Sequence, residues 1–327
     1  MPHPELTERI LRLRQMPTLK NLPPSDLAQL AASIRARTFQ KGDVMIVEDA
    51  EPRSCFLVRT GTVTMRRRGR RIGTIRAPGG VGFMSMLAQT AGGTESVAES
   101  TVEAYELRAA AMEEVFEDHF SVLLGTVKMV AERLVDELRT QPPLPFSAPR
   151  VKYEHLIGNA DLGIVERIYL LRQTRAFEKA NVNTLAALAR RMTEMRAEPG
   201  EVLWRPGDAA RHSVFIVKGM GRITREDGTE PGIVGPGYVI GGAESLIGRP
   251  RWNTFEADEP MRFLRGEESS IVDLFEDDHD FALRFLSMLA TGLVAAWDRK
   301  AEQGIAAIGS GAAGESVPSL PAAPSAP

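Results

Sequence analysis

The sequence has little cysteine, few aromatic residues and no long apolar run. Its single cysteine, Cys55, excludes an internal disulfide and any metal cluster built on several cysteines. The next residues are Phe56-Leu57-Val58, so we expect an inert, half-buried thiol. No stretch approaches the roughly 18 apolar residues of a membrane span, and the amino terminus, with Pro2 and Pro4, lacks the pattern of a signal peptide. These absences favour a cytoplasmic protein with no membrane partner.

The charge balance excludes further classes of protein. The net charge is −3 and the isoelectric point is near 6.1, which gives no general attraction to nucleic acid or to acidic membranes. The five histidines show no paired spacing of the kind that binds metal. No nucleophile and base arrangement, phosphate loop or metal motif appears either. We therefore expect no enzymatic activity, no metal and no bound cofactor.

The sequence does contain one long repeat. Glu8 and Glu166 are 158 residues apart. The same spacing separates Ile10 from Ile168, Leu13 from Leu171, Gly42 from Gly200, Gly61 from Gly219 and Pro78-Gly79 from Pro236-Gly237. Solenoid repeats recur every 20 to 50 residues or so, which is far shorter. A length of 327 residues, against roughly 150 per domain, agrees with one whole domain that has been duplicated.

The composition along the chain sets the predicted domain boundaries. The first domain covers 1–141, and a proline-rich linker covers 142–150. The second domain covers 151–303. The remaining segment, 304–327, is rich in Gly, Ala, Ser and Pro, so we expect it to be disordered. We call the two predicted domains copy one and copy two.

Each copy begins with helices, continues with many short strands and ends with a long helix. In copy one the predicted elements are a helix over 6–13, a helix from Leu27 to about Arg37 capped by Pro23-Pro24-Ser25-Asp26, strands over 44–47, 56–58 and 62–65, and one helix from Ala110 to about Arg139. Copy two repeats this plan, with Asp227-Gly228 as a hairpin turn and one helix from about Ser269 to Glu302. Many short strands between turn residues predict a barrel or a sandwich.

Two strings in copy two resemble a known family. Residues 200–208, GEVLWRPGD, followed by 213–219, SVFIVKG, are similar to the first half of a cyclic nucleotide-binding domain. Residues 236–246 and 249–254 resemble that family's phosphate-binding cassette. The resemblance covers both copies and implies a mainly β fold with flanking helices. Each copy would be an eight-stranded, jelly-roll-like β-roll, as in the regulatory subunits of cyclic-AMP-dependent kinase and the ligand domain of the catabolite activator.

The resemblance also implies a ligand and a set of binding residues. The ligand would be a cyclic nucleotide, cAMP or cGMP, contacted by Gly241, Gly242, Ala243, Glu244, Arg251, Trp252 and Asn253. Backbone amides and a guanidinium would meet the phosphate, and a carboxylate would accept the ribose 2′-hydroxyl. Arg251 matches the family's phosphate-binding arginine, although a surface ion pair or a solvated arginine is the alternative.

Copy two departs from the family at two positions. Gly242 stands where the ribose-binding Glu is expected, and Trp252 stands where a small residue is usual. Glu244 could replace the missing carboxylate, but two residues along a helix turn it by about 200°. An indole at Trp252 either fills the pocket or turns outward as a partner surface.

Copy one departs further from the family. Gly82 matches the cassette glycine, but Phe83 replaces the Glu, and residues 92–96, GGTES, replace the arginine-containing string. Glu95 would repel an anion at that place. We therefore expect copy one to bind no cyclic nucleotide and to act as a structural or partner-binding module.

Three other features have more than one interpretation. The basic run Arg66–Arg71, with Gly69 at the turn, is either a solvated hairpin or a surface for an anionic partner. Trp297 is either a core or interface residue or a lid over a purine. The apolar row Leu123, Val127 and Val130 either packs against the other long helix or forms a homodimer.

The sequence leaves two functions open. The first is a non-catalytic regulator in which at most copy two binds a cyclic nucleotide and transmits the event through its C-terminal helix to an unidentified protein partner. The alternative is a degenerate scaffold that binds no nucleotide. No kinase-inhibitor linker is recognised, because the arginine run 66–71 falls between two predicted strands. Residues 305–327 are too short and too rich in Gly and Pro for a helix-turn-helix, so we expect no DNA partner.

Overall fold

A computed structural model describes residues 4–302, apart from 17–18, 20–21, 49, 51–52, 90–93, 142–160, 175–176 and 179. The predicted linker and the predicted disordered tail lie outside these residues. Contacts divide the chain into two compact units. Unit 1 contains Met1–Val122 and the stretch from Val294 onward, and unit 2 contains Leu123–Leu293. Both dividing points fall inside helices, so each unit combines residues of the two sequence copies.

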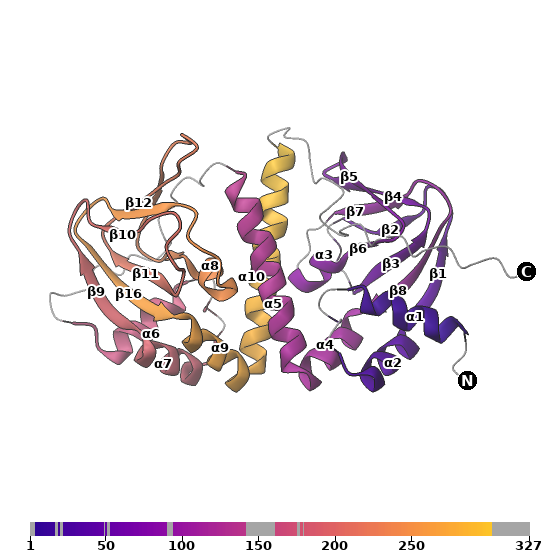
Figure 1. The fold of residues 1–327 in the computed structure, drawn as a ribbon, viewed down its shortest axis with the longest axis horizontal. Helices are drawn as coiled ribbons and strands as arrows, with labels where there is room; N and C mark the ends of the chain where they lie inside the picture. Colours follow the sequence, from indigo (N-terminus) through magenta and orange to yellow (C-terminus); the bar gives the residue numbers. More distant parts are fainter. Residues whose placement is uncertain are drawn as a thin grey trace, which may run out of the picture. The chain divides into compact units, whose positions relative to one another are not determined.

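Unit 1 contains the first β-roll (Figure 1). Its strands are β1 (Arg35–Phe39), β2 (Val44–Ile46), β3 (Ser54–Thr60), β4 (Thr62–Arg67), β5 (Arg70–Arg76), β6 (Gly79–Val81), β7 (Glu95–Ala98) and β8 (Val102–Arg108). They form two four-stranded antiparallel sheets, ordered β1-β8-β3-β6 and β2-β7-β4-β5. Its helices are α1 (Pro4–Arg14), α2 (Pro24–Ser33), α3 (Phe83–Ala88) and α4 (Ala109–Asp118).

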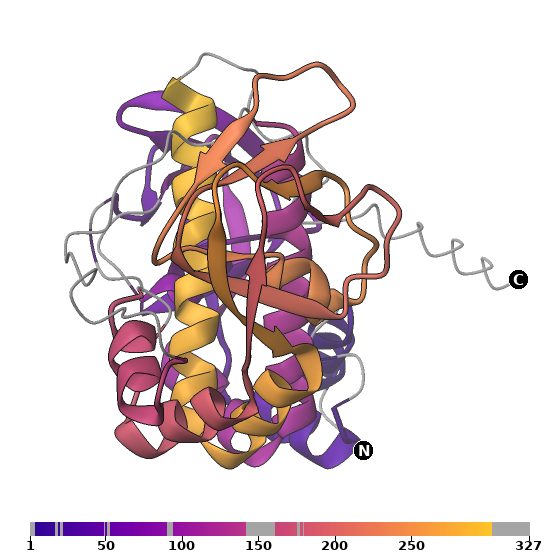
Figure 2. The same ribbon diagram turned by 90° about the vertical axis from the view of Figure 1, so that its left-hand side faces the viewer.

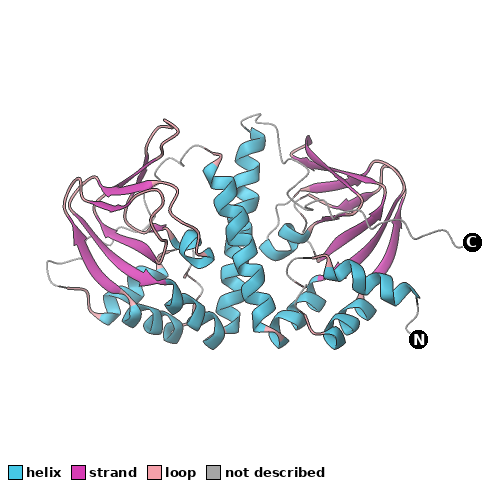
Figure 3. Ribbon diagram, in the orientation of Figure 1, coloured by secondary structure: helices cyan, strands magenta, loops and turns pink. Residues whose placement is uncertain are grey.

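Unit 2 contains a second roll, whose strands are drawn in magenta like those of the first (Figure 3). Its strand order is the same as in the first roll. Its strands are β9 (Thr193–Ala197), β10 (Val202–Trp204), β11 (His212–Lys218), β12 (Gly221–Thr224), β13 (Gly232–Val234), β14 (Val239–Ile240), β15 (Thr254–Ala257) and β16 (Met261–Glu267). The sheets are β9-β16-β11-β14 and β10-β15-β12-β13. The helices are α6 (Ile164–Arg172), α7 (Val182–Arg191), α8 (Gly242–Ile247) and α9 (Glu268–Asp277). Figure 2 shows α6, α7 and α9 together at one end of this roll.

Two long helices complete the fold, α5 (Phe120–Arg139) and α10 (His279–Glu302). Most of each belongs to unit 2, because the units divide after Val122 and after Leu293. The fold class predicted from the sequence, mainly β with two eight-stranded rolls and flanking helices, is confirmed.

The core of each roll lies between its two sheets. Alternate residues of the strands point inward, as the two-residue period of a strand requires. In unit 1 they form one buried cluster: Met45, Ile46, Phe56, Val58, Val63, Ile75, Val81, Ala98, Val102 and Ala104. In unit 2 the corresponding cluster is Ala197, Trp204, Val214, Ile216, Val234, Phe255, Ala257, Met261 and Phe263.

One repeated glycine shows why the two rolls share their register. Gly61 and Gly219, between the third and fourth strands of each roll, have φ of +90° and +82°. A Cβ at Gly61 would lie 2.3 Å from the Thr101 carbonyl oxygen, and one at Gly219 would lie 2.4 Å from that of Pro260. Only glycine has both the freedom in φ and the absence of a side chain that this close approach requires.

One repeated arginine fixes the N-terminal helices. Arg9 on α1 donates a hydrogen bond to the Ile34 carbonyl at 3.1 Å. Arg167 on α6 donates to the Met192 carbonyl at 2.7 Å. Ile34 and Met192 end the second helix of each copy. The duplicated arginine thus holds the two N-terminal helices of each copy together.

Several predicted boundaries are corrected by the structure. Helix α2 ends at Ser33 rather than near Arg37, because residues from Arg35 pair with β8 as strand β1. Its N-cap is Pro23, and neither Ser25 nor Asp26 caps it with a side-chain hydrogen bond. The predicted turn at Asp227 lies in the loop between the antiparallel strands β12 and β13.

Each long C-terminal helix is two helices rather than one. In copy one the break is at His119, with φ −133°, and in copy two it is at Asp278, with φ −135°. The Asp278 carboxylate accepts a hydrogen bond from the Phe281 amide at 2.9 Å, which starts α10. Apolar residues on both sides of the break continue the helical period, so the sequence pattern concealed it.

The apolar row predicted on α5 is internal. Leu123, Val127 and Val130 are each 0% exposed, so they form no dimer surface in this structure. Among the described residues, one helix segment could cross a membrane by length and composition alone, His279–Lys300 of α10, with hydropathy 1.3 and 44% of the window buried. The core helix of a soluble protein meets the same criterion, so this helix does not contradict the expectation of no membrane partner. Phe281, Leu286, Leu289 and Leu293 of this helix belong to the protein interior.

Candidate functional site

The cassette of copy two is a turn, a short helix and a loop. Strand β14 ends at Gly241, which has φ +75° and begins α8. After α8, the loop 249–253 returns to the roll. The Arg251 amide donates to the Asp208 carbonyl at 2.9 Å, and the Gly207 amide donates to the Arg251 carbonyl at 2.8 Å. These two backbone bonds fix the place from which the Arg251 side chain enters the roll.

Arg251 is buried rather than solvated. Its residue is 3% exposed, so the surface alternative suggested by the sequence is wrong. Its terminal nitrogens donate to the Gly241 carbonyl at 2.9 Å and to the His212 carbonyl. The guanidinium carbon lies 4.1 Å from the centroid of the Trp204 ring, in cation–π geometry. Its Nε is buried and has no hydrogen-bond acceptor.

The site is electropositive. Among the described residues, no carboxylate forms an ion pair with Arg251 within 4.0 Å. Burial lowers the pKa of Arg251 from its usual value, and the charges of Glu244 and Asp208 only partly oppose this effect. Burial also lowers the pKa of His212, and the positive charges of Arg265 and Arg251 add to that effect. A buried cation without a paired anion is costly, so the surroundings of Arg251 favour an anionic group.

The two glycines of the cassette have different surroundings. A Cβ at Gly241 would lie 2.2 Å from the Arg251 Nη1 atom. At Gly242 the nearest atoms to a Cβ are Val239 Cγ1 at 3.6 Å and Ser213 Cβ at 3.7 Å, which are ordinary contacts. The Arg251 guanidinium therefore leaves no room for a side chain at position 241, whereas position 242 has room for a Cβ. Ala243, beside it, lies in the first turn of α8.

Sequence reasoning missed Trp204. This residue is 4% exposed and lies between the Arg251 guanidinium and the Phe255 ring, whose centroid is 4.8 Å away. Its Nε1 donates to Asn253 Oδ1 at 3.1 Å, so the predicted site residue Asn253 orients Trp204. Trp204 occurs in the string 200–208, whose resemblance to the family rests on its glycines. An aromatic residue at an inward strand position was the available signal.

Trp252 is half-buried and lies outside the core cluster of unit 2. Its Nε1 donates to Glu244 Oε1 at 2.8 Å, and the Arg225 guanidinium lies 4.7 Å from its ring centroid. The predicted replacement acceptor, Glu244, is therefore already engaged. The structure brings Trp252 and Glu244 together, and the charge of Glu244 still acts on Arg251.

Copy one has an apolar group where copy two has its arginine. Gly82 has φ +85°, and a Cβ there would lie 2.8 Å from Cδ1 of Ile46. Ile46 corresponds to Trp204 and belongs to the buried cluster of unit 1. Glu95 forms an ion pair with Arg66 at 3.7 Å. Residues 92 and 93 lie outside the described residues.

The basic run of copy one forms the predicted hairpin, with Arg66 and Arg71 partly exposed and Arg67 not. Strands β4 and β5 pair across Arg68 and Gly69, with φ of +48° and +72°. Arg67 is mostly buried and contacts Asp298 on α10 at 2.6 Å, within unit 1. The thiol of Cys55 was predicted to be half-buried, but it is fully buried at 1% exposure. Burial raises its pKa to about 12, which agrees with the inert character that was predicted.

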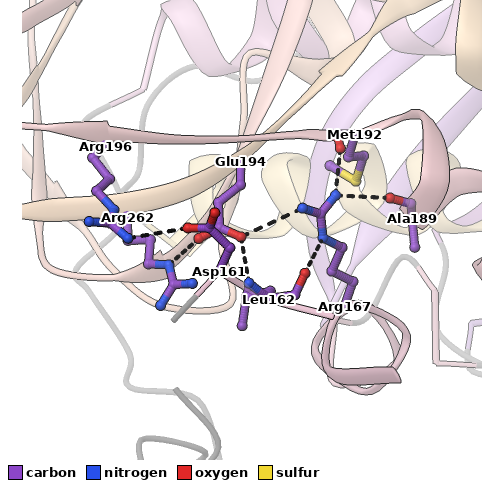
Figure 4. A network of polar contacts seen from close by, with 8 residues as sticks. All are labelled: Asp161, Leu162, Arg167, Ala189, Met192, Glu194, Arg196 and Arg262. Atoms are coloured by element: carbon purple, nitrogen blue, oxygen red, sulfur yellow. Dashed lines mark hydrogen bonds and ion pairs between the residues drawn. The ribbon is translucent and has the colours of Figure 1, made fainter. Parts of the chain in front are cut away.

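A second polar cluster of unit 2 surrounds Glu194 on β9 (Figure 4). Glu194 is central: it accepts hydrogen bonds from Arg262 and from the Leu162 amide at 2.8 Å, and it lies 3.6 Å from Arg167. The surrounding depression is open, with a volume of about 490 Å³. Arg167 also donates to the backbone carbonyls of Ala189 and Met192. Glu194 is thus paired with two arginines, and the cluster holds α6 to β9.

Comparison with known proteins gives a family match in both copies. The model of the cyclic nucleotide-binding domain matches residues 36–119 and 194–278. No curated protein matches. The regulatory domain of Toxoplasma gondii protein kinase A, solved with cAMP, is 13% identical, with a TM-score of 0.34, 89% of this chain covered and 98% of that chain. A cyclic nucleotide-binding-like protein from Brucella abortus is 26% identical, with a TM-score of 0.30, 34% of this chain covered and 98% of that chain.

Proposed function

The chain belongs to the cyclic nucleotide-binding domain family, with two domains in tandem, and we propose that it is a non-catalytic cytoplasmic regulator. Copy two binds a cyclic nucleotide, cAMP or cGMP, through the anionic phosphate. Copy one binds none and has a structural role. The binding event in copy two is transmitted through α10 to a protein partner.

The buried guanidinium of Arg251 supports this proposal most directly. Nε has no acceptor, and no carboxylate neutralises the charge among the described residues. A cyclic phosphate is a single anion that would supply both the charge and the acceptor. The first amides of α8 lie next to Gly241 and would meet the same oxygen atoms.

The absence of a ribose acceptor supports weak binding. Gly242 carries no carboxylate, and Glu244 is held by Trp252. A missing charge-assisted hydrogen bond costs about 1.5 to 3 kcal/mol, which is roughly a tenfold to hundredfold loss of affinity. We therefore expect a weaker complex than a domain with that carboxylate would form.

One observation favours the alternative, a scaffold that binds no nucleotide. Both terminal nitrogens of Arg251 are already bonded to the carbonyls of Gly241 and His212. A ligand must compete with those bonds. If it cannot, the same residues simply tie the cassette to the roll.

Titration calorimetry of the full chain with cAMP and with cGMP tests the two functions. We expect heat of binding from the wild type and none from Arg251→Gln, which removes the charge. Arg190→Ala is the matched control, because Arg190 is an exposed arginine on α7, and it should bind like the wild type. If the wild type shows no heat of binding at about millimolar nucleotide, even weak affinity is excluded. The regulator that binds a nucleotide is then ruled out, and the scaffold is the function.

A further inference from the structure

Unit 2 contains a helix that the sequence assigns to copy one. Residues from Leu123 to Arg139 of α5 belong to this unit, and Figure 1 shows them near α8. Arg249, just after α8, donates from its two terminal nitrogens to Glu132 and to Asp136. Those acidic residues are four apart, so they lie on one face of α5. The cassette loop is thus bound to α5 by a two-acid clamp.

A second contact holds the C-terminal end of α5. Arg225 donates to the Leu138 carbonyl at 3.0 Å and to the Arg139 carbonyl at 3.5 Å. Carbonyls in the last turn of a helix lack partners within the helix, and a cation there is favoured by the helix dipole. The same guanidinium lies over the ring of Trp252, whose Nε1 donates to Glu244 on α8. These contacts form a continuous chain from α5 to the cassette helix.

The two contacts lie on either side of the candidate ligand residue. Arg249 is two residues before Arg251, and Trp252 is the next residue after it. The free Nε of Arg251 can donate one hydrogen bond to an anion, but a second, bidentate bond needs a terminal nitrogen that now bonds to a backbone carbonyl. Freeing that nitrogen requires the loop 249–253 to shift. A shift of that loop must strain or break the contacts of Arg249 with α5 and the contact of Trp252 with Arg225, which itself bonds to the end of α5.

We propose that α5 is a strap that holds the cassette of copy two closed, with Arg249 and Arg225 as its positioning residues. Docking of the strap and binding of a ligand at Arg251 are negatively coupled. A docked strap lowers the affinity for an anionic ligand, and a bound ligand loosens the end of α5. The ligand part rests on the proposed function, whereas the strap itself does not.

Amide hydrogen exchange on the full chain tests the strap without ligand. Arg249→Glu replaces attraction by repulsion, so we expect exchange at 132–139 and at 242–247 to accelerate by about tenfold, a coupling of ordinary size. The charge-swapped variant, Arg249→Glu with Glu132→Arg and Asp136→Arg, should restore slow exchange. Arg284→Glu is the control, because it breaks an exposed pair with Asp280 on α10. Unchanged exchange in Arg249→Glu, or no restoration in the swap, overturns the strap.

Fluorescence gives an independent measurement if a reversal variant does not fold. Arg225→Gln should release Trp252 into water and shift its emission to longer wavelength, and the same substitution in a Trp252→Phe background should leave the emission unchanged. This background separates Trp252 from Trp204 and Trp297. No shift in Arg225→Gln would show that Arg225 does not position Trp252.

Calorimetry with cAMP and cGMP tests the opposition between strap and ligand. Arg249→Glu and Arg225→Gln should bind at least about fivefold more tightly than the wild type, the lower end of typical coupling between sites. Equal or weaker binding overturns the opposition. If no variant binds either nucleotide while the exchange results hold, the proposed function fails and the strap stands as a structural contact.

Discussion

At the scale of single residues, the cassettes of the two copies differ in which side chain is buried beside the first cassette glycine. Arg251 is recognisable in the sequence, but nothing there shows that its guanidinium is buried against Trp204 and two carbonyls. Its role as an anion ligand remains a prediction. In copy one, Ile46 occupies the corresponding space beside Gly82.

Gly241→Ala tests whether Arg251 determines the residue at the start of the cassette. The new Cβ would lie 2.2 Å from Nη1 of Arg251, in addition to the strain of φ +75°. Gly228→Ala is the control, because its φ is +74° and its Cβ would meet nothing within 4 Å. Both variants should lose about 1 kcal/mol from the backbone, and urea denaturation should show a further loss of about 1 to 3 kcal/mol for Gly241→Ala alone. Equal losses would show that Arg251 moves aside freely.

Gly242→Glu tests whether affinity is limited by the missing carboxylate. The position has room for a Cβ and an ordinary backbone conformation. A ribose acceptor there should raise cyclic nucleotide affinity roughly tenfold to hundredfold, as measured by calorimetry. Ala243→Glu, which places the same charge one residue along, should give no such gain. A gain that is equal in both variants would contradict a specific contact with the ribose.

At the scale of elements, both copies keep a polar contact between the helix break and the second helix, but the donor and acceptor residues are reversed. In copy one His119 contacts Asp26 at 3.0 Å, which joins the break after α4 to α2. In copy two Asp278, at the corresponding break, accepts hydrogen bonds from Thr184 and from Asn181 at 2.6 Å. Donor and acceptor have changed places, so residue identity alone does not reveal the correspondence.

Asp278→Ala should destabilise the start of α10. It removes the acceptor for the Phe281 amide, for the α7 N-cap Asn181 and for Thr184, so we expect a loss of about 1 to 2 kcal/mol in the free energy of unfolding. Asp280→Ala, which removes an exposed carboxylate in the same turn, is the control for charge. Denaturant unfolding followed by circular dichroism measures both. Similar losses in the two variants would contradict the capping role.

The cluster around Glu194 predicts a dependence of stability on pH. Burial alone would raise the pKa of Glu194, but hydrogen bonds from Arg262 and the Leu162 amide lower it below its ordinary value of 4.5. A lowered pKa in the folded state means that the stabilisation is complete above pH 4.5 and is lost as the pH falls through the lowered value. Glu194→Gln should therefore flatten the acid side of the stability curve. Glu198→Gln, at an exposed carboxylate, should leave the curve unchanged.

At the scale of the whole molecule, the compact units do not coincide with the sequence copies. Most of α5 belongs with the second roll, and the end of α10 from Val294 belongs with the first. Asp298 on α10 pairs with Arg67 of the first roll. Each unit thus contains part of a long helix that the sequence assigns to the other copy. The predicted boundary at 141 describes the sequence copies and stays a prediction.

A fragment of residues 1–141 should reveal this exchange. In the full chain Leu123, Val127 and Val130, which belong to unit 2, are buried. Without the second roll they would be exposed as a continuous apolar row, so we expect the fragment to bind a hydrophobic dye or to self-associate. Sedimentation velocity measures the association. A fragment ending at His119, which lacks the row, is the control and should stay monomeric.

The sequence by itself determined the duplication, the mainly β fold and the position of the cassette. Glycines with positive φ and inward apolar residues are local requirements, so they recur at a spacing that a reader can recognise. Only the tertiary structure decided the surroundings of Arg251, the partner of Trp252 and the unit to which α5 belongs. Those depend on contacts between residues as far apart as Asp136 and Arg249, and no local pattern records which distant side chain fills a given space.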